Sequence, residues 1–284
     1  MTSTAFVLTR PRTEDMLPLV CDSPHSGTVY PADFGYSAPH GLLRMGEDTH
    51  VETLWSAVPD VGGTLLAALF PRTYIDPNRS LEDLDPTLLD GPWPHALAPG
   101  EKSRLGYGLI WRQVNAQTPI YDRKLSVAEA QQRITRYWQP YREALTHEIE
   151  QAASRFGGVW HLNLHSMPNN AYQRLGIHSN RPLADFVLGD RDGSTCEPGF
   201  VEVVERSLRH AGYSVARNDP YKGVAVLAEI GQPQRHRHSL QIEIRRPLYM
   251  DEETRQPNRG FAVVRTDLQG VLRQVAAYVA SRLR

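Results

Sequence analysis

The protein has 284 residues, with 31 Lys and Arg against 32 Asp and Glu and a formal net charge of −1. Hydrophobic residues make up 40% and charged residues 22% of the chain, which excludes collagen-like, coiled-coil and wholly disordered proteins. The balanced charge argues against nucleic-acid binding, which needs clustered excess base. The longest apolar run, Leu65–Phe70, is far shorter than the ~20 residues of a membrane span. With no signal-peptide pattern and two cysteines, we expect a cytoplasmic protein that binds neither nucleic acid nor membrane.

Short apolar runs mark the elements expected in the N-terminal half of the chain. Residues 17–22 predict a buried strand, and strands are also expected at 64–70 and 72–75. Residues 46–58 predict a helix with one apolar face. That face comprises Val51, Leu54, Trp55 and Val58. The stretch 76–108 is rich in Pro, Gly and acidic residues, and so long a loop rarely persists in a compact domain without a use.

Helices and strands alternate in the C-terminal half as well. Residues 126–156 predict a helix that opens with a capping box and is kinked or broken at Pro140. A second capping box predicts a helix over 194–210. Strands are expected at 159–164, 186–188 and 240–244. An amphipathic C-terminal helix is marked by Leu268, Val271, Leu272, Val275 and Val279. Intermixed helices and strands without a linker predict one α/β domain over 1–284.

Three side chains lie at or near the ends of expected strands. His25 and His165 each follow a strand, and Glu243 lies near the end of another. Ligands of α/β sheets gather beyond strand ends, so these residues are candidates for one site. Two imidazoles and a carboxylate suit a catalytic zinc, although each histidine is equally compatible with a structural role in a turn. The acids Glu47 and Asp48 and the imidazole of His50 are alternative third ligands.

Candidate substrate-binding residues lie between the candidate metal ligands in the sequence. The planar fork of Arg79 suits a carboxylate, and Asn78 adds an amide donor, although a β-turn with a surface arginine explains the same residues. Arg112 follows a glycine-containing apolar segment. Glu243 alternates with Ile242 and Ile244, so it points away from the core if they point into it. Nucleophile-elbow, Walker, dinucleotide-binding and Cys-x-x-Cys motifs are absent from the sequence.

A series of short motifs resembles the N-formylglutamate amidohydrolase family over about residues 19–252. The motifs are Asp22-Ser-Pro-His-Ser-Gly27, Glu47-Asp-Thr-His-Val51, Pro71-Arg-Thr-Tyr-Ile-Asp-Pro-Asn-Arg79, Gly106-Tyr-Gly-Leu-Ile-Trp-Arg112, Asn163-Leu-His-Ser-Met-Pro168, Leu188-Gly-Asp-Arg-Asp-Gly193, Asn218-Asp-Pro-Tyr-Lys-Gly223 and Gln241-Ile-Glu-Ile-Arg-Arg-Pro-Leu-Tyr-Met-Asp251. Each motif is short, but their order and number make the resemblance specific.

The resemblance implies a three-layer α/β/α fold with a central mixed sheet, of the phosphorylase/hydrolase-like type found in zinc carboxypeptidases and aspartoacylases. It implies that His25 and His165 bind Zn²⁺, with Asp48 chosen over Glu47 as the third ligand. By the same resemblance, Glu243 is the general base that activates the attacking water.

The resemblance also implies a small-molecule substrate, N-formyl-L-glutamate, which is hydrolysed to formate and L-glutamate in histidine degradation. Asn78 and Arg79 would hold one carboxylate, and Arg112 is the candidate for the second. Val224 and Arg142 depart from the family pattern near the expected site, which leaves the acyl amino acid open. Hydrolysis of another N-acyl amino acid and a non-catalytic carboxylate-binding role are the alternatives.

Overall fold

The structure is a computed structural model that describes residues 4–283. The chain divides into two compact units, each treated separately below. Unit 1 comprises residues 4–7, 24–48 and 67–146, and unit 2 comprises residues 8–23, 49–66 and 147–283. The single domain expected from the sequence therefore stays a prediction. Within residues 4–283, no helix is both long enough and apolar enough to cross a membrane.

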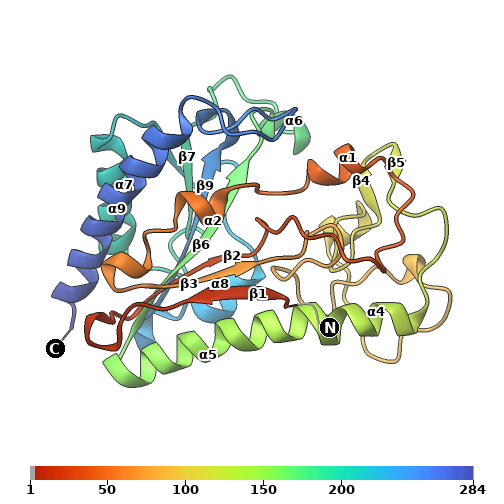
Figure 1. The fold of residues 1–284 in the computed structure, drawn as a ribbon, viewed down its shortest axis with the longest axis horizontal. Coiled ribbons are helices and arrows are strands. Elements are labelled where there is room, and N and C mark those ends of the chain that lie inside the picture. The colour runs from red at the N-terminus through yellow and green to blue at the C-terminus, as the bar shows by residue number, and fades with distance from the viewer. Residues whose placement is uncertain (1–3, 284) are drawn as a thin grey trace. The chain divides into compact units, whose positions relative to one another are not determined.

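The elements follow one another in a mixed order along the chain (Figure 1). The strands are β1 (Phe6–Thr9), β2 (Leu19–Ser23), β3 (Thr64–Ala68), β4 (Gln113–Asn115), β5 (Thr118–Pro119), β6 (Val159–Met167), β7 (Phe186–Gly189), β8 (Val215–Arg217) and β9 (Arg237–Arg245). The α-helices are α1 (His40–Arg44), α2 (Val51–Leu54), α3 (Glu101–Arg104), α4 (Val127–Arg133), α5 (Gln139–Phe156), α6 (Ala171–Arg174), α7 (Pro198–His210), α8 (Ala225–Ile230) and α9 (Phe261–Ser281).

Seven strands form a central sheet in the order β1-β3-β2-β6-β9-β7-β8. The three strands β2, β6 and β9 are parallel neighbours, so their carboxyl ends lie at the same edge of the sheet. Strand β7 runs antiparallel to β9, which makes the sheet mixed. The α/β fold with a central mixed sheet is therefore confirmed.

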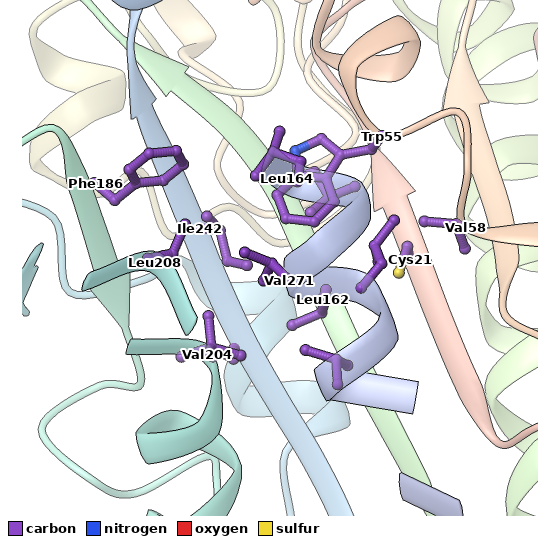
Figure 2. Close-up of a cluster of buried hydrophobic side chains, with 14 of the residues drawn as sticks. Cys21, Trp55, Val58, Leu162, Leu164, Phe186, Val204, Leu208, Ile242 and Val271 are labelled. Atoms are coloured by element: carbon purple, nitrogen blue, oxygen red, sulfur yellow. The ribbon is translucent and has the colours of Figure 1, made fainter. Parts of the chain in front are cut away.

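One face of the sheet in unit 2 carries an apolar core. Residues from β2, β6, β7 and β9 meet residues from α2, α7 and α9 in this cluster (Figure 2). Helices α7 and α9 lie side by side over this face (Figure 1). The amphipathic C-terminal helix is confirmed, because its five predicted apolar positions are all buried in the cluster. The cluster includes Cys21, Trp55, Leu162, Leu164, Phe186, Leu208, Ile242 and Val271.

The opposite face of the same strands is polar and also buried. Because strand side chains alternate between the two faces, the residues between Leu162 and Leu164 in β6 and between Ile242 and Ile244 in β9 point away from the core. On β6 these residues include His161, Asn163 and His165, and on β9 they include Ser239, Gln241 and Glu243. The predicted orientation of Glu243 is confirmed. This polar face supplies the candidate site residues of unit 2.

Two expected elements of the N-terminal half differ from the structure. Residues 46–58 contain only the short helix α2, because His50 has a φ of 72°, a left-handed conformation that a helix cannot pass through. The expected strand at 72–75 is a turn, in which the amide of Tyr74 donates to the carbonyl of Pro71. The apolar face of 46–58 is nevertheless buried as predicted.

Two expected helix features in the C-terminal half also differ. The helix over 126–156 opens with the predicted capping box, but it is not broken at Pro140. A π-helical segment, Ile134–Trp138, precedes this proline, and its wider turn leaves room for a residue without an N–H. The second predicted capping box is wrong, because α7 begins at Pro198 with Glu197 as its N-cap.

Candidate active site

In unit 1, the turn that follows β2 brings His25 beside Asp48. The amide of Asp48 donates to the carbonyl oxygen of His25 at 2.9 Å, which fixes the two residues relative to each other. The Nδ1 atom of His25 lies 3.5 Å from Oδ2 of Asp48, and both side chains are buried. Two ligands of a tetrahedral zinc ion lie about 3.3–3.4 Å apart when each bond is about 2.0–2.1 Å long. The pair therefore has the spacing of two metal ligands.

Glu47, the alternative third ligand, has other partners. Its Oε1 accepts a hydrogen bond from the Tyr30 hydroxyl at 2.8 Å, and Arg44 Nε lies 3.3 Å from both carboxylate oxygens. Glu47 raises the pKa of the Tyr30 phenol in addition to the larger effect of burial. The geometry therefore favours Asp48 over Glu47 as a neighbour of His25.

Asp76 is a residue whose role the sequence interpretation missed. Its Oδ1 lies 2.8 Å from Nε2 of His25, and its Oδ2 accepts from Arg72 at 3.1 and 2.7 Å. Burial would raise the pKa of Asp76, but Arg72, His25 and Arg79 outweigh it and hold the pKa well below its ordinary value. An ionised carboxylate only accepts, so His25 donates through Nε2 and presents Nδ1 toward Asp48. The only sequence feature that could have indicated this role is the position of Asp76 as the first residue of the Asp-Pro-Asn-Arg turn.

Arg79 extends this cluster from the same turn. Its Nε lies 3.9 Å from Oδ2 of both Asp76 and Asp83, and it makes no hydrogen bond within the described residues. Burial lowers the pKa of the guanidinium, whereas Asp76 opposes the shift, and the group remains charged. The indole of Trp138 donates to the Arg79 carbonyl at 3.0 Å, which anchors its backbone. A half-buried guanidinium is suited to bind an anion through those of its donors that the neighbouring carboxylates do not engage.

Two other candidates have structural partners. Arg112 Nε donates to Oδ2 of Asp85 at 2.8 Å, and this pairing contributes to the lowered pKa of Asp85 against the effect of burial. His50 lies in unit 2, where its Nε2 is 2.9 Å from the carbonyl oxygen of Arg255. Arg112 stays an untested prediction as a carboxylate ligand.

His165 in unit 2 belongs to a buried hydrogen-bonded network on the polar face of the sheet. Asn163 Nδ2 donates to Asp22 Oδ1 at 2.7 Å, which orients the amide so that its Oδ1 accepts from His165 Nε2 at 2.6 Å. His161 bonds to Asp22 at 2.9 Å and to Ser239 at 2.8 Å. Both ring nitrogens of His161 are engaged in this network, as expected for a structural histidine, whereas His165 joins the network through Nε2.

Glu243 lies level with His165 in the neighbouring parallel strand. Adjacent strands are about 4.8 Å apart, so these two side chains leave the same face of the sheet side by side. The amide of Gln241 donates to Oε1 of Glu243 at 2.9 Å, and only 7% of Glu243 is exposed. A carboxylate in this environment is held in one orientation and is suited to accept a proton.

Among the described residues, His25, Asp48 and His165 are a group of buried side chains that could hold a metal ion. The two imidazoles and the carboxylate form a donor set typical of zinc. The carboxyl and amide groups that bind the far nitrogen of each imidazole are typical outer partners of metal-bound histidine. The chemistry of these side chains makes them candidate ligands of a metal ion in an α/β fold.

Comparisons with known proteins identify the family. The model of the N-formylglutamate amidohydrolase family matches residues 17–250. The N-formylglutamate deformylase of Pseudomonas aeruginosa is 27% identical over 243 residues, which are 84% of each chain. The crystal structure of N-formylglutamate amidohydrolase from Ralstonia eutropha JMP134 is 67% identical, with a TM-score of 0.96 over 98% of this chain and 99% of that chain. A protein from Agrobacterium tumefaciens that is 18% identical shares the fold, with a TM-score of 0.65 over 99% of this chain and 95% of that chain.

The chain belongs to the N-formylglutamate amidohydrolase family. The predicted resemblance is confirmed, and so is the prediction that the protein is a hydrolase of a linear amide bond.

Proposed function

We propose that the protein is a zinc-dependent amidohydrolase that removes the formyl group from N-formyl-L-glutamate. The products would be formate and L-glutamate, in a cytoplasmic step of histidine degradation. The names of the relatives from Pseudomonas aeruginosa and Ralstonia eutropha support the substrate. The observation that carries the chemistry is the position of Glu243 level with His165 on the buried polar face.

We propose His25, Asp48 and His165 as the metal ligands. In the parallel pair β2–β6, Asp22 is level with Asn163, and His25 follows Asp22 by three residues while His165 follows Asn163 by two. Hydrogen bonds at Nε2 orient both imidazoles, which supports coordination through Nδ1. When bound, the ion supplies Lewis acidity and makes water reactive near neutral pH.

Glu243 performs the proton transfers in the proposed reaction. Its carboxylate takes a proton from the attacking water as the new bond to the formyl carbon forms. The same group then gives the proton to the amide nitrogen as the carbon–nitrogen bond breaks. The hydrogen bond from Gln241 keeps the carboxylate in place for both transfers.

Arg79 holds a carboxylate of the substrate in this proposal. The guanidinium of Arg79 is largely removed from water and remains charged, which supports this role, and Asn78 beside it is buried with its backbone amide bonded to Asp76 at 2.9 Å. Asp76 contacts His25 through Oδ1, and its Oδ2 lies 3.9 Å from Nε of Arg79. The Arg79 side chain that would bind the substrate carboxylate is thereby held in position relative to His25, one of the proposed metal ligands.

Metal analysis combined with formate release from N-formyl-L-glutamate tests the proposal. We expect the wild-type protein to release formate, to lose this activity with a chelator and to regain it with zinc. Glu243→Gln removes the proton acceptor but keeps the shape of the side chain. It should retain the metal and lose about 10²- to 10⁴-fold in kcat.

Glu202→Gln on the exposed surface of α7 is the matched control and should keep full activity. Full activity of Glu243→Gln would contradict the general-base role. A wild-type protein that contains zinc but releases no formate from this substrate would contradict the proposed function.

A further inference from the structure

Helices α7 and α9, which lie side by side (Figure 1), form a groove on the surface of unit 2. The groove has a volume of about 610 Å³, which is within the usual range of small-molecule sites. Both helices pack on the apolar face of the sheet, whereas Glu243 leaves the opposite face. The groove is therefore separate from the part of the candidate active site that unit 2 carries.

Two arginines line this groove, Arg206 from α7 and Arg273 from α9. Neither guanidinium forms a hydrogen bond or an ion pair within residues 4–283. Along α9, the positions three and four residues from Arg273 carry no acid that could pair with it. On α7, Glu205 is engaged by Arg209 and Arg217 instead of Arg206. Both guanidinium groups are thus available to a ligand in the groove.

The acidic side chains near the groove do not cancel this charge. Among the described residues that line it, Asp267 is the one carboxylate, and its Oδ2 accepts from the Tyr213 hydroxyl at 2.7 Å rather than from an arginine. Glu202, one turn before Arg206, lies outside the lining and makes no ion pair with it. The imidazole of His210 at the end of α7 adds a further possible donor. The lining therefore has more cationic than anionic groups.

Gly270 leaves open space inside the groove. It lies within the 21-residue helix α9, where glycine is a poor helix former. Outside the local backbone, a Cβ at this position would come within 4 Å of one described atom, Arg273 Nη2 at 4.0 Å. Close packing, a common reason for a glycine inside a helix, therefore does not explain this one. The space beside the Arg273 guanidinium is large enough to admit a ligand.

We propose that this groove binds a small organic phosphate through Arg206 and Arg273. A phosphate monoester has three oxygens and a charge of about −1.5 to −2 at neutral pH, so it suits two guanidinium groups better than a monocarboxylate does. The second oxygen of Asp267 can accept from a hydroxyl group on the organic part of the ligand. This ligand is distinct from the substrate, and the inference does not depend on the reaction that the protein catalyses.

Calorimetric titration with glycerol 3-phosphate tests the inference. We expect one saturable site per wild-type chain, with an affinity that falls as the ionic strength rises. Arg206→Gln and Arg273→Gln should each weaken binding about 10- to 100-fold, as for the loss of a charged hydrogen bond. Arg235→Gln, at an exposed position of unit 2 outside the groove, is the matched control and should bind like wild type.

Gly270→Leu provides an independent test, because it fills the groove without changing its charge. The variant should keep or raise the thermal midpoint, since leucine is a better helix former than glycine, and should lose measurable binding. A wild-type protein with no saturable binding of glycerol 3-phosphate overturns the inference. Wild-type affinity in Arg206→Gln, in Arg273→Gln or in Gly270→Leu also overturns it, because the phosphate would then bind outside the groove.

Discussion

At the scale of single residues, Asp76 connects two functions of the proposed site. One of its oxygens orients His25, and the other engages Arg72. Partners of this kind fix the tautomer of a metal-binding histidine and increase its basicity. The role of Asp76 was not predicted from the sequence, because the turn pattern of Asp-Pro-Asn-Arg explains the aspartate without any partner. Only the folded chain shows that His25, 51 positions earlier, is its neighbour.

Replacing Asp76 should weaken metal binding without removing a metal ligand. Asp76→Asn keeps the size of the side chain but loses the ionised acceptor for His25 Nε2. We expect a 10- to 100-fold loss of zinc affinity, about the usual cost of an outer partner, in a competition titration with a chromophoric chelator. Asp60→Asn, at an exposed position, should leave the affinity unchanged. Unchanged affinity in a folded Asp76→Asn protein would show that the contact has no part in metal binding.

The sequence alone could not decide between Glu47 and Asp48 as the third metal ligand. Both acids stand in the same motif, and local spacing gives no reason to prefer either. The structure separates them through contacts with residues distant in sequence, Tyr30 for Glu47 and His25 for Asp48. Arg112 is a similar case, because its pairing with Asp85 depends on the path of a long loop.

At the scale of elements, the sequence predicted the positions of the central strands more reliably than it predicted the lengths of the helices. The period-2 alternation of β9 correctly predicted that Glu243 faces away from the core, since Ile242 and Ile244 are buried in it. The C-terminal end predicted for β6, residue 164, was wrong, because the strand continues through His165 to Met167. Polar residues in a sheet give a weak strand pattern when a buried network satisfies them, as Asp22 and Asn163 do here.

The capping box of α4 gives a prediction about pH. Ser126 and Glu129 exchange hydrogen bonds, and Arg123 pairs with the Glu129 carboxylate at 2.6 Å. The Arg123 hydrogen bond is the largest effect that lowers the pKa of Glu129 from 4.5 to about 2, so the carboxylate stabilises the fold above about pH 4.5. Its contribution is lost as the pH falls through about 2.

Glu129→Gln should therefore lower the free energy of unfolding at pH 7 by about 0.2–1 kcal/mol, because glutamine keeps the capping acceptor but loses the charge that pairs with Arg123. The difference from wild type should shrink between pH 4.5 and pH 3, as measured by denaturant unfolding. Glu143→Gln, at an exposed position of α5, provides the comparison. A difference that stays constant over this pH range would contradict the role assigned to the Glu129 charge.

At the scale of the whole molecule, the α/β class and the family were predictable from the sequence. Strands and helices alternate along the chain, and the motifs keep the order of the family across residues 17–250. The division into two compact units was not predicted, because Gly and Pro are spread through the chain and no linker separates the parts. Contacts between distant segments define such units, and composition carries no record of them.

The central claim is that three side chains distant in sequence, His25, Asp48 and His165, bind one metal ion. A zinc titration followed by elemental analysis of the dialysed protein tests it directly. The account predicts one zinc ion per wild-type chain. It also predicts a loss of more than about 100-fold in affinity for His25→Ala and for His165→Ala, whereas Glu47→Gln stays close to wild type. Wild-type affinity in His165→Ala, or a wild-type chain that binds no zinc, would contradict it.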